Sequence, residues 1–365
     1  MTMTPLAPYM RAVQLLGHGG IEMLRYTETA RRPEPGRGEV LLKVGACGVN
    51  QTDVNTRIAW YAERPGDEAP AGWSGAPVRF PVIQGASIVG RVVGTGPHVD
   101  DALIGRRVVV DPLLLPVPGT ADPVVFLGSE RDGGYADYVA VPERSIVVVE
   151  SELNDVDIAA TQTTYTTAES LMLRGDVRAG ETMLITGATG GVGAALIELA
   201  KVRGCRTIAA ARPDKLDFAY ELGADMVVAR NEDGSYDLPP SIPQVDVVAD
   251  VVGGAGFQQL VDAVRDGGRV VVAGAVDGPV TSIDLRSIIY RDIDIRGVGG
   301  LEGAKGVRRV VDLLNEGRLR PRIAAVFPLR GVAAAQQMIS ARRHVGRIVI
   351  DVEGSDSRTL SLDAL

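Results

Sequence analysis

The run of small residues from Gly187 to Gly193 is the feature that most constrains the fold of this chain. It reads Gly-Ala-Thr-Gly-Gly-Val-Gly, follows the apolar segment 182–186, and precedes a segment whose apolar residues recur at helical spacing up to Gly204. A second apolar segment, 207–211, comes next. This order predicts a βαβ unit whose turn places backbone N–H groups at a helix N-terminus. We therefore expect a dinucleotide to bind at the turn.

The end of the second strand bears on the choice between NAD and NADP. An acidic residue there would accept hydrogen bonds from the ribose hydroxyls and repel a 2′-phosphate. The strand instead runs into Arg212, whose planar guanidinium suits phosphate, and Lys215 follows. In the alternative interpretation Arg212 is a solvated side chain and Asp214 contacts the ribose. The pattern favours NADPH.

Composition limits the kinds of partner. The chain has 365 residues, 45% of them hydrophobic, a formal charge of −8 and a pI near 5.1. The length allows two domains, and the charge argues against binding nucleic acid or an anionic membrane. Two cysteines, Cys47 and Cys205, argue against a disulfide framework. We expect a cytoplasmic protein acting on a small molecule, because neither a signal peptide nor a membrane span is recognisable.

The order of apolar segments predicts an α/β protein of two domains. Residues 1–150 read as short strands separated by turns, typical of a β-barrel-type domain, and 301–365 complete it because the strand 347–352 returns to it. Residues 151–300 begin with one helical stretch, 155–173, and continue with six strands, which predicts a doubly wound parallel sheet.

These features resemble the medium-chain dehydrogenase/reductase superfamily. The matching strings include Gly-Ala-Cys-Gly-Val-Asn-Gln-Thr-Asp at 45–53, the turn at 187–193, and His-Val-Gly-Arg at 344–347. The resemblance implies a GroES-like domain followed by a Rossmann domain that binds NADP. The cofactor-binding residues that we expect on this basis are Thr167, Gly187, Ala188, Thr189, Gly190, Gly191, Val192, Gly193, Arg212, Lys215, Gly253, Gly274, Ala275, Val276, Gly299 and Arg347.

Alcohol dehydrogenases of this superfamily bind zinc through a Cys in the segment matching 49–53 and a Gly-His-Glu in the segment matching 84–86. This chain has Asn50 at the first position and neither His nor Glu in the second segment. Two cysteines cannot form the structural zinc lobe. We expect the three histidines, His18, His98 and His344, to be ordinary turn or surface residues. The resemblance is therefore to the zinc-independent branch, the quinone oxidoreductases and enoyl reductases, and no metal is expected.

The segment from Asn50 to Tyr61 is similar to the N-P-x-D-I-N-x-I-x-G-x-Y segment of 2-enoyl thioester reductases. The resemblance implies that Tyr61 donates a proton and that Asn50 and Asn55 line the cleft as catalytic residues. In the alternative interpretation Tyr61 packs beside Trp60. The chain departs from the pattern at two positions and carries an insertion at 62–79, which either covers the cleft or forms a surface loop.

The sequence thus predicts an NADPH-dependent, zinc-independent oxidoreductase. It would transfer hydride to a quinone, or to an activated C=C bond of an α,β-unsaturated carbonyl or enoyl compound. The alternatives are a non-catalytic NADPH-binding protein and an alcohol dehydrogenase. The resemblance also implies a homodimer, formed by an edge strand near 293–295.

Overall fold

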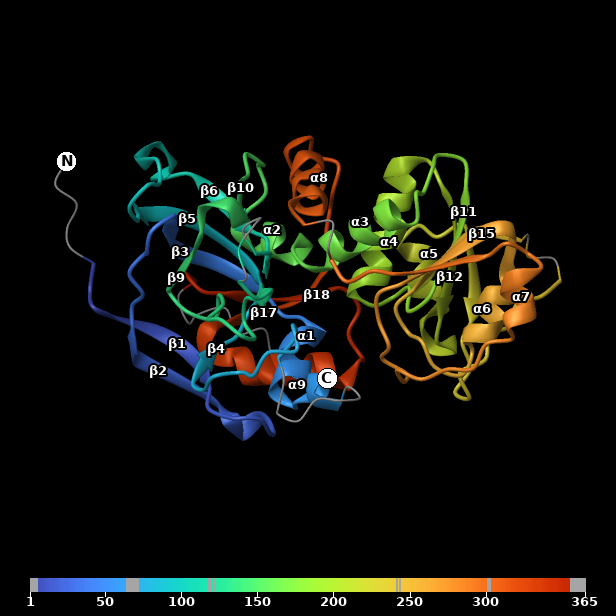
Figure 1. Ribbon diagram of the computed structural model, residues 1–365, viewed down its shortest axis with the longest axis horizontal. Helices are drawn as coiled ribbons and strands as arrows, with labels where there is room; N and C mark the ends of the chain where they lie inside the picture. The colour runs from blue at the N-terminus through green and yellow to red at the C-terminus, as the bar shows by residue number, and fades with distance from the viewer. Residues whose placement is uncertain are drawn as a thin grey trace. The chain divides into compact units, whose positions relative to one another are not determined.

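The structure is a computed structural model that describes residues 6–63, 72–116, 120, 122–240, 242, 244–300 and 303–354. The chain forms two compact units, unit 1 from residues 1–163 and 311–365, and unit 2 from residues 164–310 (Figure 1). The units divide after residues 163 and 310, which is later in the sequence than the boundaries that we expected after 150 and 300. Helix α2 (Asp155–Thr161) packs on strands of unit 1, and the second division falls within α8 (Ala304–Asn315).

Unit 1 is rich in strands, as its short apolar segments predict. Its largest sheet within the described residues has seven strands in the order β10-β6-β5-β3-β18-β17, with β9 paired to β3. Separate sheets have the orders β2-β1-β4 and β7-β8. The strands are β1 (Tyr9–Leu15), β2 (Leu24–Arg31), β3 (Glu39–Gly48), β4 (Val82–Ile83), β5 (Ser87–Thr95), β6 (Arg107–Val110), β7 (Leu113–Leu114), β8 (Val125–Phe126), β9 (Tyr138–Pro142), β10 (Ile146–Val148), β17 (Ile323–Pro328) and β18 (Arg347–Asp351).

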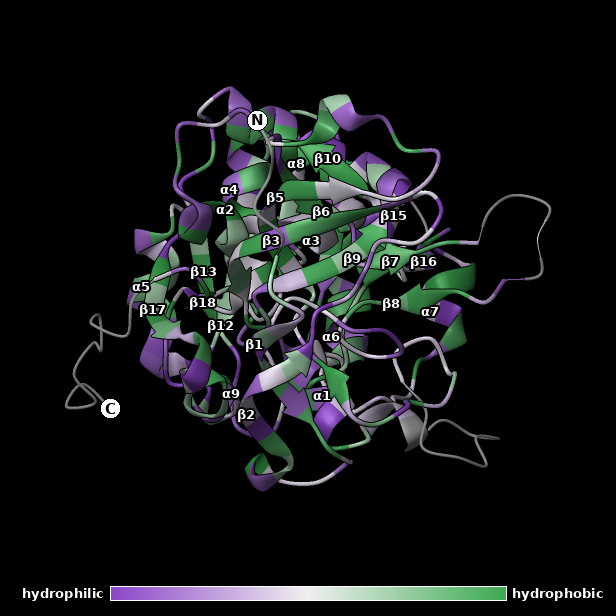
Figure 2. Ribbon diagram, turned by 90° about the vertical axis from the view of Figure 1, so that its left-hand side faces the viewer, coloured by the Kyte–Doolittle hydropathy of each residue, from purple (hydrophilic) through white to green (hydrophobic). Residues whose placement is uncertain are grey.

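Strand β3 lies at the centre of unit 1. It pairs antiparallel with β5, β9 and β18, and of its ten residues only Glu39 and Lys43 are not buried. The core around it includes Leu42, Ile88 and Tyr135. Strands β5 and β6 carry mainly hydrophobic colours in Figure 2, whereas the more exposed β2 is hydrophilic along part of its length. The pairing with β18 brings the end of the chain back into unit 1.

Short helices connect and cover these strands. α1 (Gln51–Arg57) follows β3 directly, and α9 (Val332–Ala341) packs on β17, β18 and α1. The 3₁₀ helices among the described residues are η1 (Ile21–Met23), η2 (Trp60–Glu63), η3 (Asp101–Leu103), η4 (Glu143–Ser145), η5 (Pro213–Lys215) and η6 (Leu329–Gly331).

The single helical stretch expected over 155–173 is two helices in the structure, α2 and α3 (Thr164–Arg174). Gln162 is extended, and Thr163 has a φ of 52°, in the left-handed region that a β-branched residue rarely adopts. An α-helix cannot continue through these two conformations. The break coincides with the division between the units at Thr163.

In its described residues, unit 2 is built on a six-stranded sheet in the order β13-β12-β11-β14-β15-β16, in which every pair is parallel. The strand order reverses between β11 and β14, which is where a doubly wound sheet binds its ligand. The strands are β11 (Thr182–Ile185), β12 (Arg206–Ala211), β13 (Met226–Ala229), β14 (Val245–Asp250), β15 (Val264–Val272) and β16 (Asp294–Gly297). The further helices are α4 (Gly191–Arg203), α5 (Leu216–Glu221), α6 (Phe257–Ala263) and α7 (Leu285–Ile289).

The connection from β13 to β14 contains no helix among its described residues. Tyr236 anchors it, because its ring is buried in the core of unit 2 and its backbone N–H donates to Gln259 Oε1 at 2.9 Å. The connection therefore reaches the start of α6 along an irregular path.

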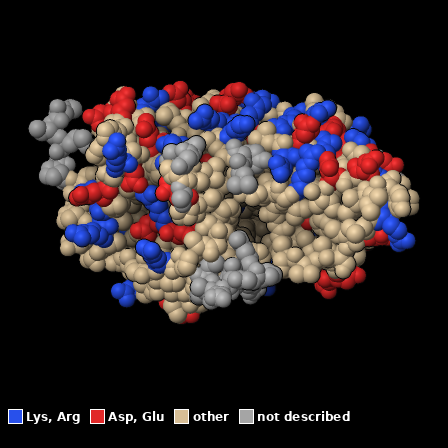
Figure 3. Space-filling model, in the orientation of Figure 1, with Lys and Arg blue, Asp and Glu red and all other residues tan. Residues whose placement is uncertain are grey.

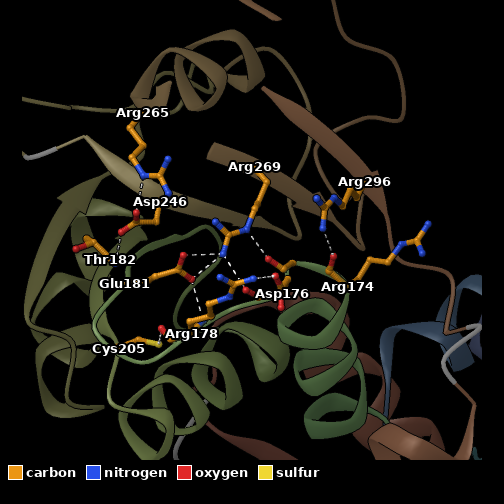
Figure 4. Close-up of polar contacts among 11 residues, drawn as sticks. Arg174, Asp176, Arg178, Glu181, Thr182, Cys205, Asp246, Arg265, Arg269 and Arg296 are labelled. Carbon is orange, nitrogen blue, oxygen red and sulfur yellow. Dashed lines mark hydrogen bonds and ion pairs between the residues drawn. The ribbon is translucent and has the colours of Figure 1, made fainter. Parts of the chain in front are cut away.

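Arginines from two strands hold the loop between α3 and β11 (Figure 4). Arg269 of β15 donates through Nη2 to both carboxylate oxygens of Glu181, at 2.8 and 2.7 Å, and through Nε to Gly175 O. Arg296 of β16 donates to Arg174 O at 2.9 Å. The carbonyls at the end of α3, which have no partner within the helix, are satisfied in this way.

Candidate functional site

The glycine-rich turn between β11 and α4 leaves space where a pyrophosphate would lie. Gly190 caps α4 and is exposed, and a Cβ built on it would meet only Gly187 O, at 3.2 Å. Among the described residues, a side chain at this position would be tight against that one backbone oxygen and would otherwise enter open space. Since the first N–H groups of a helix have no partner within it, the open space in front of them fits an anion.

The other glycines of the turn have structural roles. Gly187 has a φ of 55°, and a Cβ on Gly193 would lie 2.3 Å from Gly187 O and 2.6 Å from the Cα of Ala188. Close packing of α4 on the turn thus excludes a side chain at Gly193. Ala188 donates its N–H to Ala210 O of β12 at 3.1 Å, and Thr189 is buried.

The tip of β12 carries two cations. Arg212 follows the strand, its side chain is half-exposed, and its Nη2 lies 3.4 Å from Asp214 Oδ2. Lys215 is buried, and burial, aided by the charge of Arg212, lowers its pKa. Asp214, which is the ribose ligand in the alternative interpretation, thus forms an ion pair with Arg212 in the structure. Both cations lie beyond the end of β12, where the sequence predicts that the ribose of the cofactor binds.

Five of the expected cofactor residues follow the strands β14, β15 and β16, at the same carboxyl edge of the sheet; they are Gly253, Gly274, Ala275, Val276 and Gly299. The turn after β14 is held by Asp250, which accepts from the N–H groups of Val252 and Gly253, at 2.9 and 3.1 Å. Burial raises the pKa of Asp250. A Cβ on Gly274 would lie 2.4 Å from Val251 O, so the turns after β14 and β15 are packed together.

The other predicted residues at this edge are more open. Val276 is 46% exposed, and a Cβ on Gly299 would meet none of the described residues within 4 Å. Ala275 contacts the turn after β14, because its Cα lies 3.4 Å from a Cβ built on Gly253. Thr167 is half-buried on α3.

In unit 1, Asn50 lies in a chain of buried hydrogen bonds. Its Nδ2 donates to Ser87 Oγ at 2.9 Å and Gly48 O at 3.3 Å, and its Oδ1 accepts from Arg347 Nη2 at 2.8 Å. Ser87 Oγ donates in turn to Thr163 Oγ1 at 2.8 Å. The protein thus uses the donors and the acceptor of the Asn50 amide, which fixes the orientation of the side chain.

Arg347, expected as a cofactor ligand, is 7% exposed and lies within unit 1. Besides Asn50 it donates to Ala160 O at 3.1 Å and Val49 O at 3.2 Å. These contacts link β18 to the end of β3 and to α2. In this arrangement Arg347 positions Asn50.

Sequence reasoning missed Asp53, which lies three residues after Asn50 and is only 2% exposed. Its carboxylate accepts from Asn50 N and Tyr135 Oη, each at 2.8 Å, and from Gly85 N at 3.2 Å. Burial outweighs these bonds and raises the pKa of Asp53 to about 6. The spacing of Asn50 and Asp53 is that of a helix capping box, so this signal was available in the sequence.

The two other predicted catalytic residues lie near the same helix. Asn55 of α1 is half-buried and accepts from Gln51 Nε2 at 3.0 Å. Tyr61 is 5% exposed, and its ring packs edge-on against Trp60 at 5.4 Å between centroids. This contact agrees with the packing interpretation of Tyr61, and the proton-donor role stays a prediction. Residues 64–71 of the 62–79 insertion lie outside the described residues.

Ala86 lies in the segment 84–86, which matches the Gly-His-Glu segment of the alcohol dehydrogenases. It is fully buried in an apolar cluster with Leu113 and Phe126, and Trp73 stacks on Phe126 at 4.9 Å. In the part of the chain that the structure describes, no three side chains of His, Cys, Asp or Glu are grouped so that they could hold a metal ion. His18 contacts Thr56 O at 2.8 Å through Nδ1.

Comparisons with known proteins cover both units. Residues 36–151 match the alcohol dehydrogenase GroES-like domain, and residues 191–316 match the zinc-binding dehydrogenase family. The crystal structure of a putative alcohol dehydrogenase from Sinorhizobium meliloti 1021 is 39% identical and superposes with a TM-score of 0.85, covering 95% of this chain and 97% of that one.

The chain belongs to the medium-chain dehydrogenase/reductase superfamily. Among its superfamily relatives are the quinone oxidoreductase of Lama guanicoe, 27% identical over 93% of this chain and 97% of the relative, and the chloroplastic NADPH-dependent alkenal/one oxidoreductase of Arabidopsis thaliana, 25% identical over 93% and 79%. Members of this superfamily are oxidoreductases that use a nicotinamide cofactor. The predicted fold class, a GroES-like domain with a Rossmann domain, is confirmed.

Two further observations bear on partners. None of the helices in the described ranges is both long and apolar enough to cross a membrane. On the face shown in Figure 3, acidic and basic side chains are interspersed and form no extended surface of one sign. That face lacks the continuous basic surface that contacts with nucleic-acid phosphates require.

Proposed function

We propose that this protein is an NADPH-dependent, zinc-independent reductase. It transfers hydride to a quinone, or to the activated C=C bond of an α,β-unsaturated carbonyl or enoyl compound. The observation that carries the proposal is the environment of Asn50 and Ala86. Where zinc-dependent relatives place metal ligands, this chain has an amide held by Arg347 and Ser87 and a methyl group buried among apolar side chains. Without a Lewis acid, an alkoxide would lack stabilisation, which favours an acceptor that is already electron-poor.

The residues at the carboxyl edge of the sheet fit a dinucleotide. The N–H groups at the start of α4 would hold the pyrophosphate, and Arg212 and Lys215 would pair with the 2′-phosphate. When bound, the nicotinamide supplies the hydride. The name of the Arabidopsis relative, which uses NADPH on alkenals and alkenones, supports this choice of cofactor and acceptor.

The groups of unit 1 align and polarise the acceptor. Arg347 keeps Asn50 in one orientation, and Asp53 fixes the first turn of α1, which carries Asn55. We assign to Tyr61 the role of donating the proton that completes enone reduction, because it ends the segment from Asn50 to Tyr61 that resembles the enoyl reductases. Such preorganised groups act by orientation and electrostatics.

Oxidation of NADPH in the presence of a panel of quinones and enones tests the proposal. Turnover with at least one class, unchanged by a chelator, is the expected result. Tight NADPH binding without turnover on any acceptor would identify a non-catalytic NADPH-binding protein instead.

Alcohol oxidation is the second candidate, because the 39% identical relative is named a putative alcohol dehydrogenase. Elemental analysis of the purified protein separates the two. If the protein holds one tightly bound zinc per chain, and removal of this zinc abolishes turnover of alcohols, the protein is an alcohol dehydrogenase and the proposed reductase activity is wrong.

A further inference from the structure

A second arginine, Arg230, has its backbone beside that of Arg212 at the carboxyl edge of the sheet. Strands β12 and β13 pair so that Ala211 lies opposite Ala229, and Arg230 N donates to Ala211 O at 2.7 Å. Adjacent strands lie about 4.8 Å apart. Arg212 and Arg230 therefore begin from neighbouring strand ends, and both side chains are long enough to reach one ligand placed between them.

In the structure Arg230 is held by a carboxylate. Its Nη2 forms an ion pair with Asp277 Oδ2, and its guanidinium carbon lies 5.9 Å from the centroid of the Tyr236 ring. The Arg230 side chain is only 15% exposed, and within the described residues its buried Nε has no hydrogen-bond partner. Within the described residues, the pair with Asp277 therefore does not use all the donors of the guanidinium.

Asp277 belongs to the segment after β15, close to the expected cofactor residues. Its N–H donates to Val252 O at 2.9 Å, and a Cβ built on Gly254 would lie 2.6 Å from its Oδ2. The side chain of Asp277 is 43% exposed. The ion pair therefore joins the segments after β13 and β15 at the edge where the cofactor binds, and its acidic member remains accessible to solvent.

We propose that Arg230 is a second ligand of the cofactor's 2′-phosphate, and that Asp277 competes with the phosphate for it. The inference rests on the proposed use of NADPH. A phosphate carries more charge than a carboxylate and offers three oxygens to the guanidinium fork, so it can displace Asp277. A nucleotide without the 2′-phosphate leaves the pair intact. Selectivity then depends on two arginines and one competing acid.

The proposal predicts opposite effects for the two members of the pair. Arg230→Gln should weaken binding of a 2′-phosphorylated nucleotide by about tenfold or more, because a charge-assisted bond is lost. Asp277→Asn should tighten it by about two- to fivefold, because a half-exposed ion pair no longer competes. In the double variant the second change should have no effect, because the arginine that it would release is absent.

Isothermal titration with 2′,5′-ADP and with 5′-AMP, as probes with and without the phosphate, measures these effects without turnover. Neither single variant should change the affinity for 5′-AMP. Asp284→Asn is the matched control, because it removes the carboxylate of an exposed pair with Arg286, 2.6 Å apart, and should leave both affinities unchanged. Circular dichroism confirms that each variant is folded.

Several outcomes separate this inference from the proposed function. If the unmodified protein prefers 2′,5′-ADP and Arg212→Gln abolishes the preference, while Asp277→Asn changes nothing, then NADPH use stands and the role of Arg230 is wrong. If Asp277→Asn tightens both probes equally, the competition model is also wrong. If the unmodified protein does not distinguish the probes, the choice of NADPH and this inference both fail.

Discussion

At the scale of single residues, two glycines three positions apart have different tasks. A side chain at Gly190 would enter the space in front of α4, whereas one at Gly193 would overlap the backbone of Gly187 and Ala188. Gly190→Val should therefore abolish NADPH binding with little change in melting temperature. Gly193→Ala should lower the melting temperature. Gly17→Val, where the nearest other atom is Met23 Sδ at 3.8 Å, is the control.

Fluorescence titration with NADPH and calorimetric melting distinguish the two variants. Normal NADPH binding by Gly190→Val would place the phosphates elsewhere in the molecule.

Tyr61 tests the reaction class. General acid catalysis typically contributes ~10²–10⁴-fold, so Tyr61→Phe should slow reduction of an enone by about this factor. A quinone should be reduced nearly as before, because solvent can protonate its product oxygen. Parallel steady-state assays on one enone and one quinone, with Tyr26→Phe, at a half-buried tyrosine of β2, as control, check this. Unchanged enone reduction would mean that Tyr61 does not donate the proton, in agreement with its packing against Trp60.

Asp111 makes stability depend on pH. It is buried with one N–H bond, from Leu113, and burial raises its pKa from 3.8 to about 6. The folded state therefore binds the proton more tightly than the unfolded chain. Below about pH 4, the protonated carboxyl makes its full contribution to the stability of the folded state. This contribution, about 3 kcal/mol at most, is lost as the pH rises to about 6.

Urea unfolding of the wild type and of Asp111→Asn at pH 5 and pH 7 measures this dependence. The variant should lose less stability than the wild type between these pH values. An identical loss in both proteins would show that Asp111 titrates alike in the folded and unfolded states.

At the scale of elements, the network around Arg269 ties the end of α3 to two strands (Figure 4). Arg269 and Glu181 are both largely buried, so Arg269→Leu would leave the carboxylate without its cation and two carbonyls without this donor. Loss of one partner of a buried pair costs about 3–5 kcal/mol. Thermal melting should show a large decrease for Arg269→Leu and almost none for Arg178→Ala, whose pair with Asp176 is exposed. Equal, small decreases would mean that the network adds nothing to stability.

The comparison of elements also shows what a sequence can predict. The turn at 187–193 was predictable, because its chemistry lies within seven consecutive residues. The contact of Arg347 with Asn50 was not, because it joins residues 297 positions apart and follows from the pairing of β18 with β3. The break at Thr163 was also missed, because apolar spacing carries no signal for a left-handed threonine.

At the scale of the whole molecule, β16 is the edge of the sheet in unit 2 and is flanked by exposed apolar side chains. These include Leu285, Ile289 and Tyr290, which are 64%, 63% and 80% exposed. Antiparallel pairing of two copies about Ile295 would place Asp294 of each copy opposite Arg296 of the other. We therefore expect a homodimer formed through β16.

Reversal of one charge should weaken this dimer, and exchange of both should restore it. Asp294→Arg should shift the mass measured by light scattering toward the monomer, and the double variant Asp294→Arg with Arg296→Asp should return it to the dimer. A dimer that withstands the single change would have to use another surface.

The discontinuity of unit 1 has a consequence for the order of events during synthesis. Unit 2 is contiguous, so all of its strands have been synthesised before β17 and β18 are made. Strand β3 must wait for its neighbour β18 until almost the entire chain has been translated. Because a folded unit 2 spans the gap as one body, the closing of this long loop costs less entropy than the number of intervening residues suggests. Until then, the part of β3 that pairs with β18, Ala46 to Gly48, is open to pairing with other nascent chains, which makes the interval before β18 arrives the stage most exposed to aggregation.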